Sequence, residues 1–379
     1  MLPVLVSMFG IAAAQMWGGT KVSPTPTPAE EEEAIPAAEV ELFASGLPMS
    51  VGDVPAGLAN ITAQGCNGCH GEVHDQWASS SHARAGRSSA FRDAVLRAGQ
   101  STACTQCHRP LAAQHATLAA GYIEGDISRP NLVSNPSFSA TLMAEGVGCA
   151  ACHVRDGAVV SSRPSPDAPH PVKVSAELAR SEVCSHCHQL TYPGATSSFY
   201  DTFGEWKASP HAAAGVQCQD CHMPQVSVAT SASRFGRAAS HSDSPSLARA
   251  LTVIVELADA QAQRGIPLEY RVRIQNTGAA HHVPTGNPYK SLSFVIQLRT
   301  LEGEVLAASE SEVLRRIMSD TAPFETVSDN RIPAGGEHVF GGSVLAAHSV
   351  SAGPILFVVG AQADGEPLTV LQDIPLELN

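Results

Sequence analysis

Aromatic residues and positive charge are both scarce in this chain. Aromatics make up 5% of its 379 residues, and 23 Lys and Arg stand against 36 Asp and Glu, for a formal net charge of −13. The excess of negative charge argues against a nucleic-acid partner, whose phosphates require the opposite sign. It favours redox partner proteins with a basic docking face. The shortage of aromatics leaves little material for the cores of the two or three domains that this length allows.

No cysteine lies outside one pattern, Cys-x-x-Cys-His. The ten cysteines form five copies: CNGCH (Cys66, Cys69, His70), CTQCH (Cys104, Cys107, His108), CAACH (Cys149, Cys152, His153), CSHCH (Cys184, Cys187, His188) and CQDCH (Cys218, Cys221, His222). Two thiols three residues apart can each bond one vinyl group of a porphyrin, and the next residue, His, can ligate its iron. Zinc sites do not require that His, and a disulfide framework would not repeat this spacing. The pattern predicts five covalent haems c, whose rings supply the missing core.

The N-terminus lacks the basic residues that open an ordinary signal peptide. Residues 1–20 are mostly apolar, with an Ala-x-Ala-like site at Ala12–Ala14, and we expect a signal peptide or a short anchor. Haem c is attached outside the cytoplasm, so we expect a periplasmic or extracellular protein, associated with a membrane only through this segment if it is uncleaved. Residues 21–57 include SPTPTPAEEEEAIPAAE, which predicts a disordered linker.

The pattern of apolar residues changes near residue 247. Residues 58–246 hold every motif and read as short helical pieces, such as 88–98 and 175–181, with little sheet. Residues 247–379 contain alternating, β-branched runs at 251–257, 268–276, 291–300, 338–346, 354–362 and 368–378. In the second run Leu268, Tyr270, Val272 and Ile274 would share one face. We expect an α-helix-and-coil cytochrome domain followed by an antiparallel β-sandwich of immunoglobulin-like type.

A phrase of twelve residues occurs twice, as DQWASSSHARAG (75–86) and GEWKASPHAAAG (204–215). A haem iron has two axial positions and the motif His fills one; eleven of the sixteen histidines lie outside that role. We interpret the phrase as a distal-ligand module, with chance similarity of two surface helices as the alternative. Each pair of equivalent residues would have one role. His82 and His211 would ligate iron, Trp77 and Trp206 would pack on a porphyrin, and Ser80 and Ser209 would fix the local turn.

Four longer stretches carry a resemblance to a known family: GVGCAACHVRDG, PHPVKVSAELARSEVCSHCHQ, EWKASPHAAAGVQCQDCHMP and NTGAAHHVPTGNP. Over roughly residues 50–300 the chain resembles the multihaem c-type cytochromes related to the tetrahaem electron acceptor of ammonia oxidisers. The resemblance implies electron transfer through closely stacked haems that are mostly bis-His ligated. It also implies a set of distal ligands: His82, His170, His211, His241 and, in the GAAHHVPTG loop, His281.

Other histidines and other functions stay open at this point. His115 and His186 are the main rivals as distal ligands, His281 and His282 could be an exposed loop pair, and we expect packing roles for His74, His338 and His348. A reductase acting on a small nitrogen compound or oxyanion needs an open iron, often held by Cys-x-x-Cys-Lys, and that variant does not occur. An electron carrier is therefore the leading hypothesis over an enzyme, with a subunit of an extracellular haem wire as the structural alternative.

Overall fold

The computed structural model describes residues 40–43, 47–97, 102–125, 129–229, 236–242, 246–321 and 323–379. The predicted signal or anchor segment and most of the predicted linker lie outside these ranges. Residues 38–379 form one compact unit. In the described part of the chain, no helix has the length and apolar character needed to span a bilayer.

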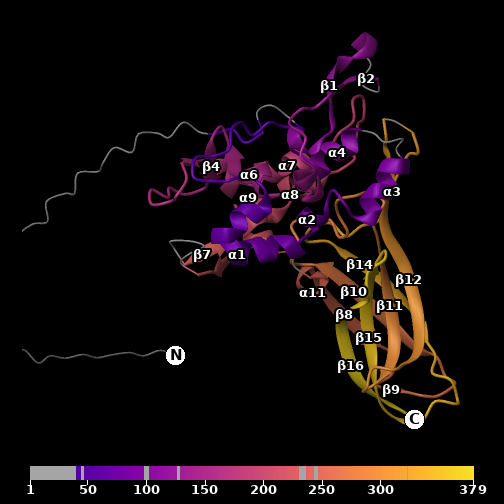
Figure 1. The fold of residues 1–379 in the computed structure, drawn as a ribbon. Helices are drawn as coiled ribbons and strands as arrows, with labels where there is room; N and C mark the ends of the chain where they lie inside the picture. Colours follow the sequence, from indigo (N-terminus) through magenta and orange to yellow (C-terminus); the bar gives the residue numbers. More distant parts are fainter. Residues whose placement is uncertain are drawn as a thin grey trace, which may run out of the picture. The chain divides into compact units, whose positions relative to one another are not determined.

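Short helices dominate the chain up to residue 250 (Figure 1). They are α1 (Ala63–Ser79), α2 (Ser81–Arg84), α3 (Ser89–Arg97), α4 (Thr102–His108), α5 (Ala140–Ala144), α6 (Cys149–His153), α7 (Glu182–His188), α8 (Thr202–Lys207), α9 (Pro210–Ala213), α10 (Cys218–His222) and α11 (Leu247–Ala250), with 3₁₀ turns at Ala112–Gln114, Ile123–Gly125 and Ala176–Ala179. The helical pieces predicted near 88–98 and 175–181 are found as α3 and the last 3₁₀ turn.

This region contains more strand than expected. Three small sheets pair β1 (Thr117–Tyr122) with β2 (Pro130–Ser134), β4 (Ala158–Ser161) with both β3 (Val154–Arg155) and β5 (Val172–Val174), and β6 (Gln225–Ser227) with β7 (Arg237–Ala239). The strands of each sheet are close in sequence, so closing the loops between them costs little conformational entropy. The β1–β2 hairpin projects from the helices (Figure 1).

The predicted linker ends earlier than residue 57. Leu42, Met49 and Val51 are buried in a cluster with α6 and the strand that follows it. The backbone of Leu42 is held from both sides, because its N–H donates to Glu177 at 2.8 Å and its carbonyl accepts from Arg155 at 2.7 Å. The linker assignment is therefore wrong for the described residues before 57. Their apolar side chains join a buried cluster, although the residues upstream are acidic.

Long strands follow from residue 251 (Figure 1). They are β8 (Leu251–Leu257), β9 (Gln261–Ala262), β10 (Leu268–Asn276), β11 (Ser291–Thr300), β12 (Val305–Met318), β13 (Thr326–Asp329), β14 (Glu337–Val344), β15 (Gly353–Ala363) and β16 (Thr369–Leu378). One sheet has the order β14-β10-β8 and the other β13-β12-β11-β15-β16-β9, and every pairing is antiparallel except β16 with β9.

Both sheets contribute side chains to one hydrophobic cluster. The four residues predicted to share a face of 268–276 are all buried there, which confirms the alternation seen in the sequence. All six predicted strands are found, while the two-residue β9, the four-residue β13 and the long β12 were missed. Its Ala-Ala-Ser-Glu-Ser-Glu stretch has little β propensity, and its fourteen residues are held by pairing with β11 on one side and β13 on the other.

Candidate haem centres

Each Cys-x-x-Cys-His motif lies in a helical turn. In α4, α6, α7 and α10 the motif His is the last helical residue, while α1 continues past His70 with a kink at that residue (φ −110°, ψ 39°). Positions i, i+3 and i+4 of a helix share one face. Both thiols and the imidazole of a motif can therefore address the same flat ring.

Thiols of different motifs contact one another. Three pairs far apart in sequence lie close enough for each thiol to shift the pKa of the other: Cys66 with Cys149, Cys107 with Cys187, and Cys184 with Cys218. The first motif thus lies beside the third, and the fourth lies beside both the second and the fifth. Groups attached at these thiols would be packed close together.

Three motif histidines each face a histidine that the sequence predicted as a distal ligand. The ring centroids are 6.3 Å apart for His82 and His188, 6.1 Å for His153 and His241, and 6.1 Å for His222 and His281. An imidazole nitrogen binds a metal ion at about 2 Å, and the ring centroid lies about 1 Å further away, so two rings that share one ion have centroids about 6 Å apart. The three spacings fit a single iron between each pair.

Hydrogen bonds orient several of these rings. In three of them Nδ1 lies 2.9 Å from a backbone carbonyl: His153 to Val160, His241 to Ala239, and His281 to His282. A carbonyl only accepts, so Nδ1 must carry the proton and donate it. The lone pair of the ring is then on Nε2, the atom left to bind a metal.

Burial keeps five of these six imidazoles neutral. It lowers the pKa of His188 to about 4, helped by nearby His82 and His222, and that of His241 to about 4, helped by His153. The pKa values of His153, His222 and His281 are lowered as well, chiefly by burial. A neutral imidazole is the form that ligates a metal.

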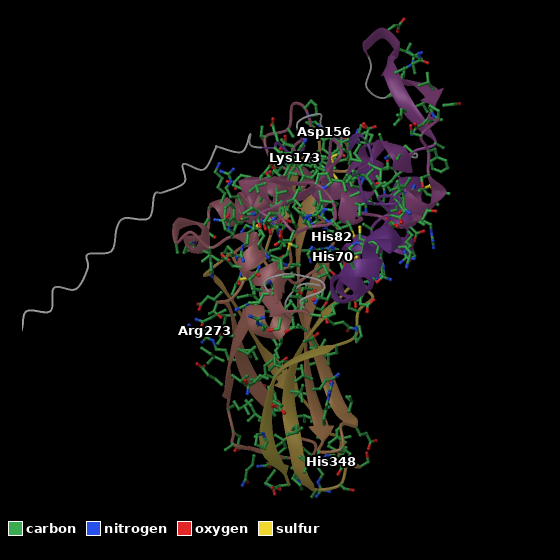
Figure 2. All side chains as sticks on the ribbon, turned by 60° about the vertical axis from the view of Figure 1, so that its left-hand side comes forward. His70, His82, Asp156, Lys173, Arg273 and His348 are labelled. Atoms are coloured by element: carbon green, nitrogen blue, oxygen red, sulfur yellow. The ribbon has the colours of Figure 1, made fainter. Side chains whose placement is uncertain are left out.

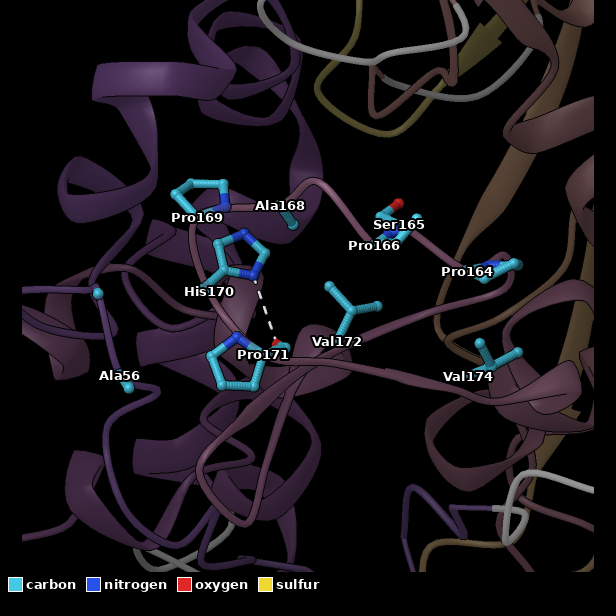
Figure 3. Close-up of a pocket in the computed structure, with 11 residues that line it drawn as sticks. Ala56, Pro164, Ser165, Pro166, Ala168, Pro169, His170, Pro171, Val172 and Val174 are labelled. Carbon is cyan, nitrogen blue, oxygen red and sulfur yellow. Dashed lines mark hydrogen bonds between the residues drawn. The ribbon is translucent and has the colours of Figure 1, made fainter. Parts of the chain in front are cut away.

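The structure does not bring His211 or His170 into such a pair within the described residues. Nδ1 of His211 is buried, and no hydrogen-bond partner lies near it in the described chain. His170 lies beside a hollow of about 600 Å³ lined mainly by the Pro164–Pro171 loop, Gly57 and Val172 (Figure 3). The described lining includes no cysteine.

The side chains of the rival histidines His115 and His186 contact other protein groups. Nε2 of His115 lies 2.7 Å from the carbonyl of Arg109. His186 stacks on Phe43 with ring centroids 4.3 Å apart, and 3.6 Å separates it from a Glu177 oxygen.

The histidines expected to have packing roles are held in the same way. His74 packs against Trp77, and His338 packs beside Phe294 and Phe340. Figure 2 shows His348 at one end of the long strands, and His70 and His82 among the short helices.

The two copies of the repeated phrase make the same contacts. The indole N–H of Trp77 donates to the carbonyl of Val147 at 2.8 Å, and that of Trp206 donates to Val216 at 2.9 Å. Each valine lies two residues before a motif, and its own N–H returns to the carbonyl of the phrase histidine at 3.0 Å. The phrase therefore docks on the chain segment that enters a motif.

The phrase serines cap the turn that follows them. The Ser80 hydroxyl accepts from the Ala83 N–H, and the Ser209 hydroxyl accepts from the Ala212 N–H. The predicted turn role of these serines is confirmed. The tryptophan contact was missed, although the shared Gly-Val at 146–147 and 215–216 before the two motifs is a signal for it.

Glu205 is the second feature that sequence reasoning missed. Its carboxylate, 2% exposed, lies 2.8 Å from the Arg331 guanidinium and 3.0 Å from the His282 ring, and it accepts from the Thr285 hydroxyl at 2.6 Å. Burial alone would raise its pKa, but the His282 hydrogen bond and the Arg331 charge outweigh burial and lower the pKa to about 2. The contacts join α8 to the loop between β10 and β11, which carries His281.

Further contacts join the same two regions. The Glu325 carboxylate accepts from the backbone and side chains of Thr196 and Ser197 at 2.6–3.1 Å. Arg316 donates to the Ser198 carbonyl at 2.6 Å. The strands are thus tied to the helical region by these charged and polar groups in addition to those of the His281 loop.

Comparison with known proteins points to one class. The family described as cytochrome c552 matches residues 200–236, which span the whole of the second phrase and the fifth motif. A pentahaem cytochrome c552 from Thermochromatium tepidum is 16% identical, with 84% of this chain and 98% of that one covered and a TM-score of 0.55. A CARDB domain from Pyrococcus furiosus, solved with two metal ions, is 14% identical over 34% of this chain and 87% of that one, with a TM-score of 0.20. No curated protein matches.

The residues present fit haem c. Paired thiols on one helical face, neutral imidazoles with Nε2 available, and ring pairs spaced for one ion are the donor set that this cofactor uses. With the family match and the shared fold, the five motifs make haem c the cofactor, with five haems per chain. The cofactor prediction is confirmed.

Proposed function

We propose that this multihaem c-type cytochrome carries electrons between redox partner proteins, through five covalently bound haems of which most are ligated by two histidines. The three ring pairs with centroids 6.1–6.3 Å apart carry the proposal. Ligation by two imidazoles fills both axial positions, so such a haem exchanges electrons without binding a substrate.

Each ring pair assigns a distal ligand to one haem. His82 serves the haem of the fourth motif, His241 that of the third, and His281 that of the fifth. His211 and His170 are assigned to the first and second motifs, without a decision on which serves which. The docking contact that the phrase of His211 shares with the phrase of His82 supports its place in this set.

The thiol contacts support a route for the electrons. They place the third motif beside the first, and the fourth beside the second and the fifth. The pKa values of Cys184 and Cys187 are raised chiefly by a neighbouring thiol and by burial, and the charge of Cys152 raises both further. This effect supports proximity of the third motif to the fourth. All five haems would then form one connected set, which a carrier requires.

The two sheets that share one core support an immunoglobulin-like β-sandwich for residues 247–379, beside a pentahaem domain at 58–246. Covalent haem c attachment supports a periplasmic or extracellular location. The net charge of −13 supports a partner with a basic docking face. The four stretches quoted from the sequence, three of which bear a motif, support a relation to the tetrahaem acceptor family.

Low-temperature electron paramagnetic resonance of the oxidised, haem-loaded protein tests the proposal. We expect low-spin signals for the bis-His haems and no substantial high-spin signal. A strong high-spin signal, with exogenous ligands binding at the same iron, would instead support an oxidoreductase with one open haem. Intact mass on the same sample reports the number of haems.

A further inference from the structure

The residue just before the tryptophan makes the same kind of contact in both copies of the phrase. Gln76 accepts a hydrogen bond through Oε1 from the backbone N–H of His241, at 2.9 Å. Glu205 accepts through Oε2 from the backbone N–H of His282, at 3.1 Å, and His282 directly follows His281. In both copies this side chain thus holds the backbone at a proposed distal ligand.

The neighbouring tryptophan reaches the opposite side of the same ring pair. Trp77 bonds Val147, which precedes the third motif, and the His153 of that motif faces His241. Trp206 bonds Val216, which precedes the fifth motif. The His222 of that motif faces His281.

We infer that Gln76–Trp77 and Glu205–Trp206 are two clamps, each of which positions both axial ligands of one haem. The first clamp serves the haem of the third motif and the second that of the fifth. Gln76 and Glu205 are the positioning residues for the distal ligands. This inference rests on the proposed bis-His ligation.

The two positioning residues differ in charge, burial and further contacts. Gln76 is neutral and partly exposed, and its contact spans 165 residues of the chain. Glu205 is buried and charged, and its ion pair with Arg331 ties the second clamp to the strands. The distal ligand of the fifth haem is therefore supplied by the strand region and held in place from α8.

The test uses the haem-loaded full chain and measures high-spin signal and carbon monoxide binding after reduction. His281→Ala should open one iron. Loss of a supporting contact weakens metal ligation by about 10- to 100-fold, so Glu205→Ala should bind carbon monoxide about 10- to 100-fold more readily than wild type. Glu205→Gln should stay low-spin, because a carboxamide oxygen can accept from the His282 N–H as Gln76 does from His241.

A double variant assigns the effect to one haem. Glu205→Ala combined with His281→Ala should open one iron only, whereas Gln76→Ala combined with His281→Ala should open two. Asp75→Ala is the matched control, since Asp75 directly precedes Gln76 and its side chain is 83% exposed; it should behave as wild type.

The outcomes separate the clamp from the ligand assignment. If His281→Ala opens no iron, the proposed ligation of the fifth haem is wrong. If His281→Ala opens an iron but Glu205→Ala behaves as wild type, or if their double variant opens two irons, the clamp is wrong. Should Glu205→Ala fail to load haem, Gln76→Ala and His241→Ala give the same test, because Gln76 leaves no buried charge behind.

Discussion

Replacing Glu205 with Gln should lower stability by an amount that depends on pH. The substitution keeps an oxygen that can accept from the His282 N–H and the Thr285 hydroxyl, but it removes the charge 2.8 Å from Arg331. The two side chains are 2% and 7% exposed, so solvent screens their attraction little.

The magnitude follows from the carboxyl pKa. It is lowered from 4.5 to about 2, and each unit corresponds to about 1.4 kcal/mol, so the charge contributes about 3 kcal/mol to the free energy of unfolding at neutral pH. Because the folded-state pKa lies below the unfolded one, this contribution is fully present above about pH 5 and is lost as the pH falls toward 2. Asp329 also bonds Arg331, at 2.7 Å, so the guanidinium keeps one partner in the variant.

Guanidinium unfolding of the haem-loaded protein, followed by far-UV circular dichroism, measures the effect. At pH 7 Glu205→Gln should be about 3 kcal/mol less stable than wild type, and the two should converge between pH 5 and 2. Glu337→Gln is the control, because its pair with Arg273 is 44% and 39% exposed and should be worth less than about 1 kcal/mol. A loss of equal size at every pH, or no loss at pH 7, would show that the Glu205 charge does not stabilise the fold.

Three other measurements address the haems and the two regions. Intact mass of fully matured protein should show five haems, and four or fewer would contradict the reading of all ten cysteines. The fragment from residue 247 onward should give dispersed NMR spectra without haem, since its two sheets bury a core of their own; spectra typical of a disordered chain would contradict this. His211→Ala should keep all five haems but convert one to high-spin, with carbon monoxide binding and a raised potential, whereas His348→Ala should change none of these. A fully low-spin His211→Ala protein that refuses carbon monoxide would remove His211 from the ligand set.

The strands were the most predictable part of the fold. Alternation of apolar residues reports burial on one face directly, so the bounds of β8, β10 and β11 agree with the sequence. β12 was not predictable in this way, because pairing with β11 holds its stretch of small and acidic residues as strand. The burial of Leu42 and Met49 was missed because an acidic, Pro-rich stretch precedes them in sequence.

At the candidate site, sequence identified residue types but not their partners. Cys-x-x-Cys-His defines its chemistry within five residues, so the haem sites were found without structure. Which histidine faces which motif depends on contacts such as Gln76 to His241, 165 residues apart, which no local spacing encodes. Glu205 was overlooked for the same reason, since its partners lie in another part of the chain.

The contacts of the first phrase carry a consequence for the order of assembly. Trp77 bonds a carbonyl 70 residues further along the chain, and His82 faces a ring in the fourth motif. Chains are made from the N-terminus, so the first phrase exists before either of these partners. The first motif, which lies in the same helix, can thus meet the attachment machinery while the phrase is still without its long-range contacts. This arrangement favours attachment of the first haem before the long-range contacts of the first phrase form, and the strand region, which follows all five motifs in the chain, is made after them.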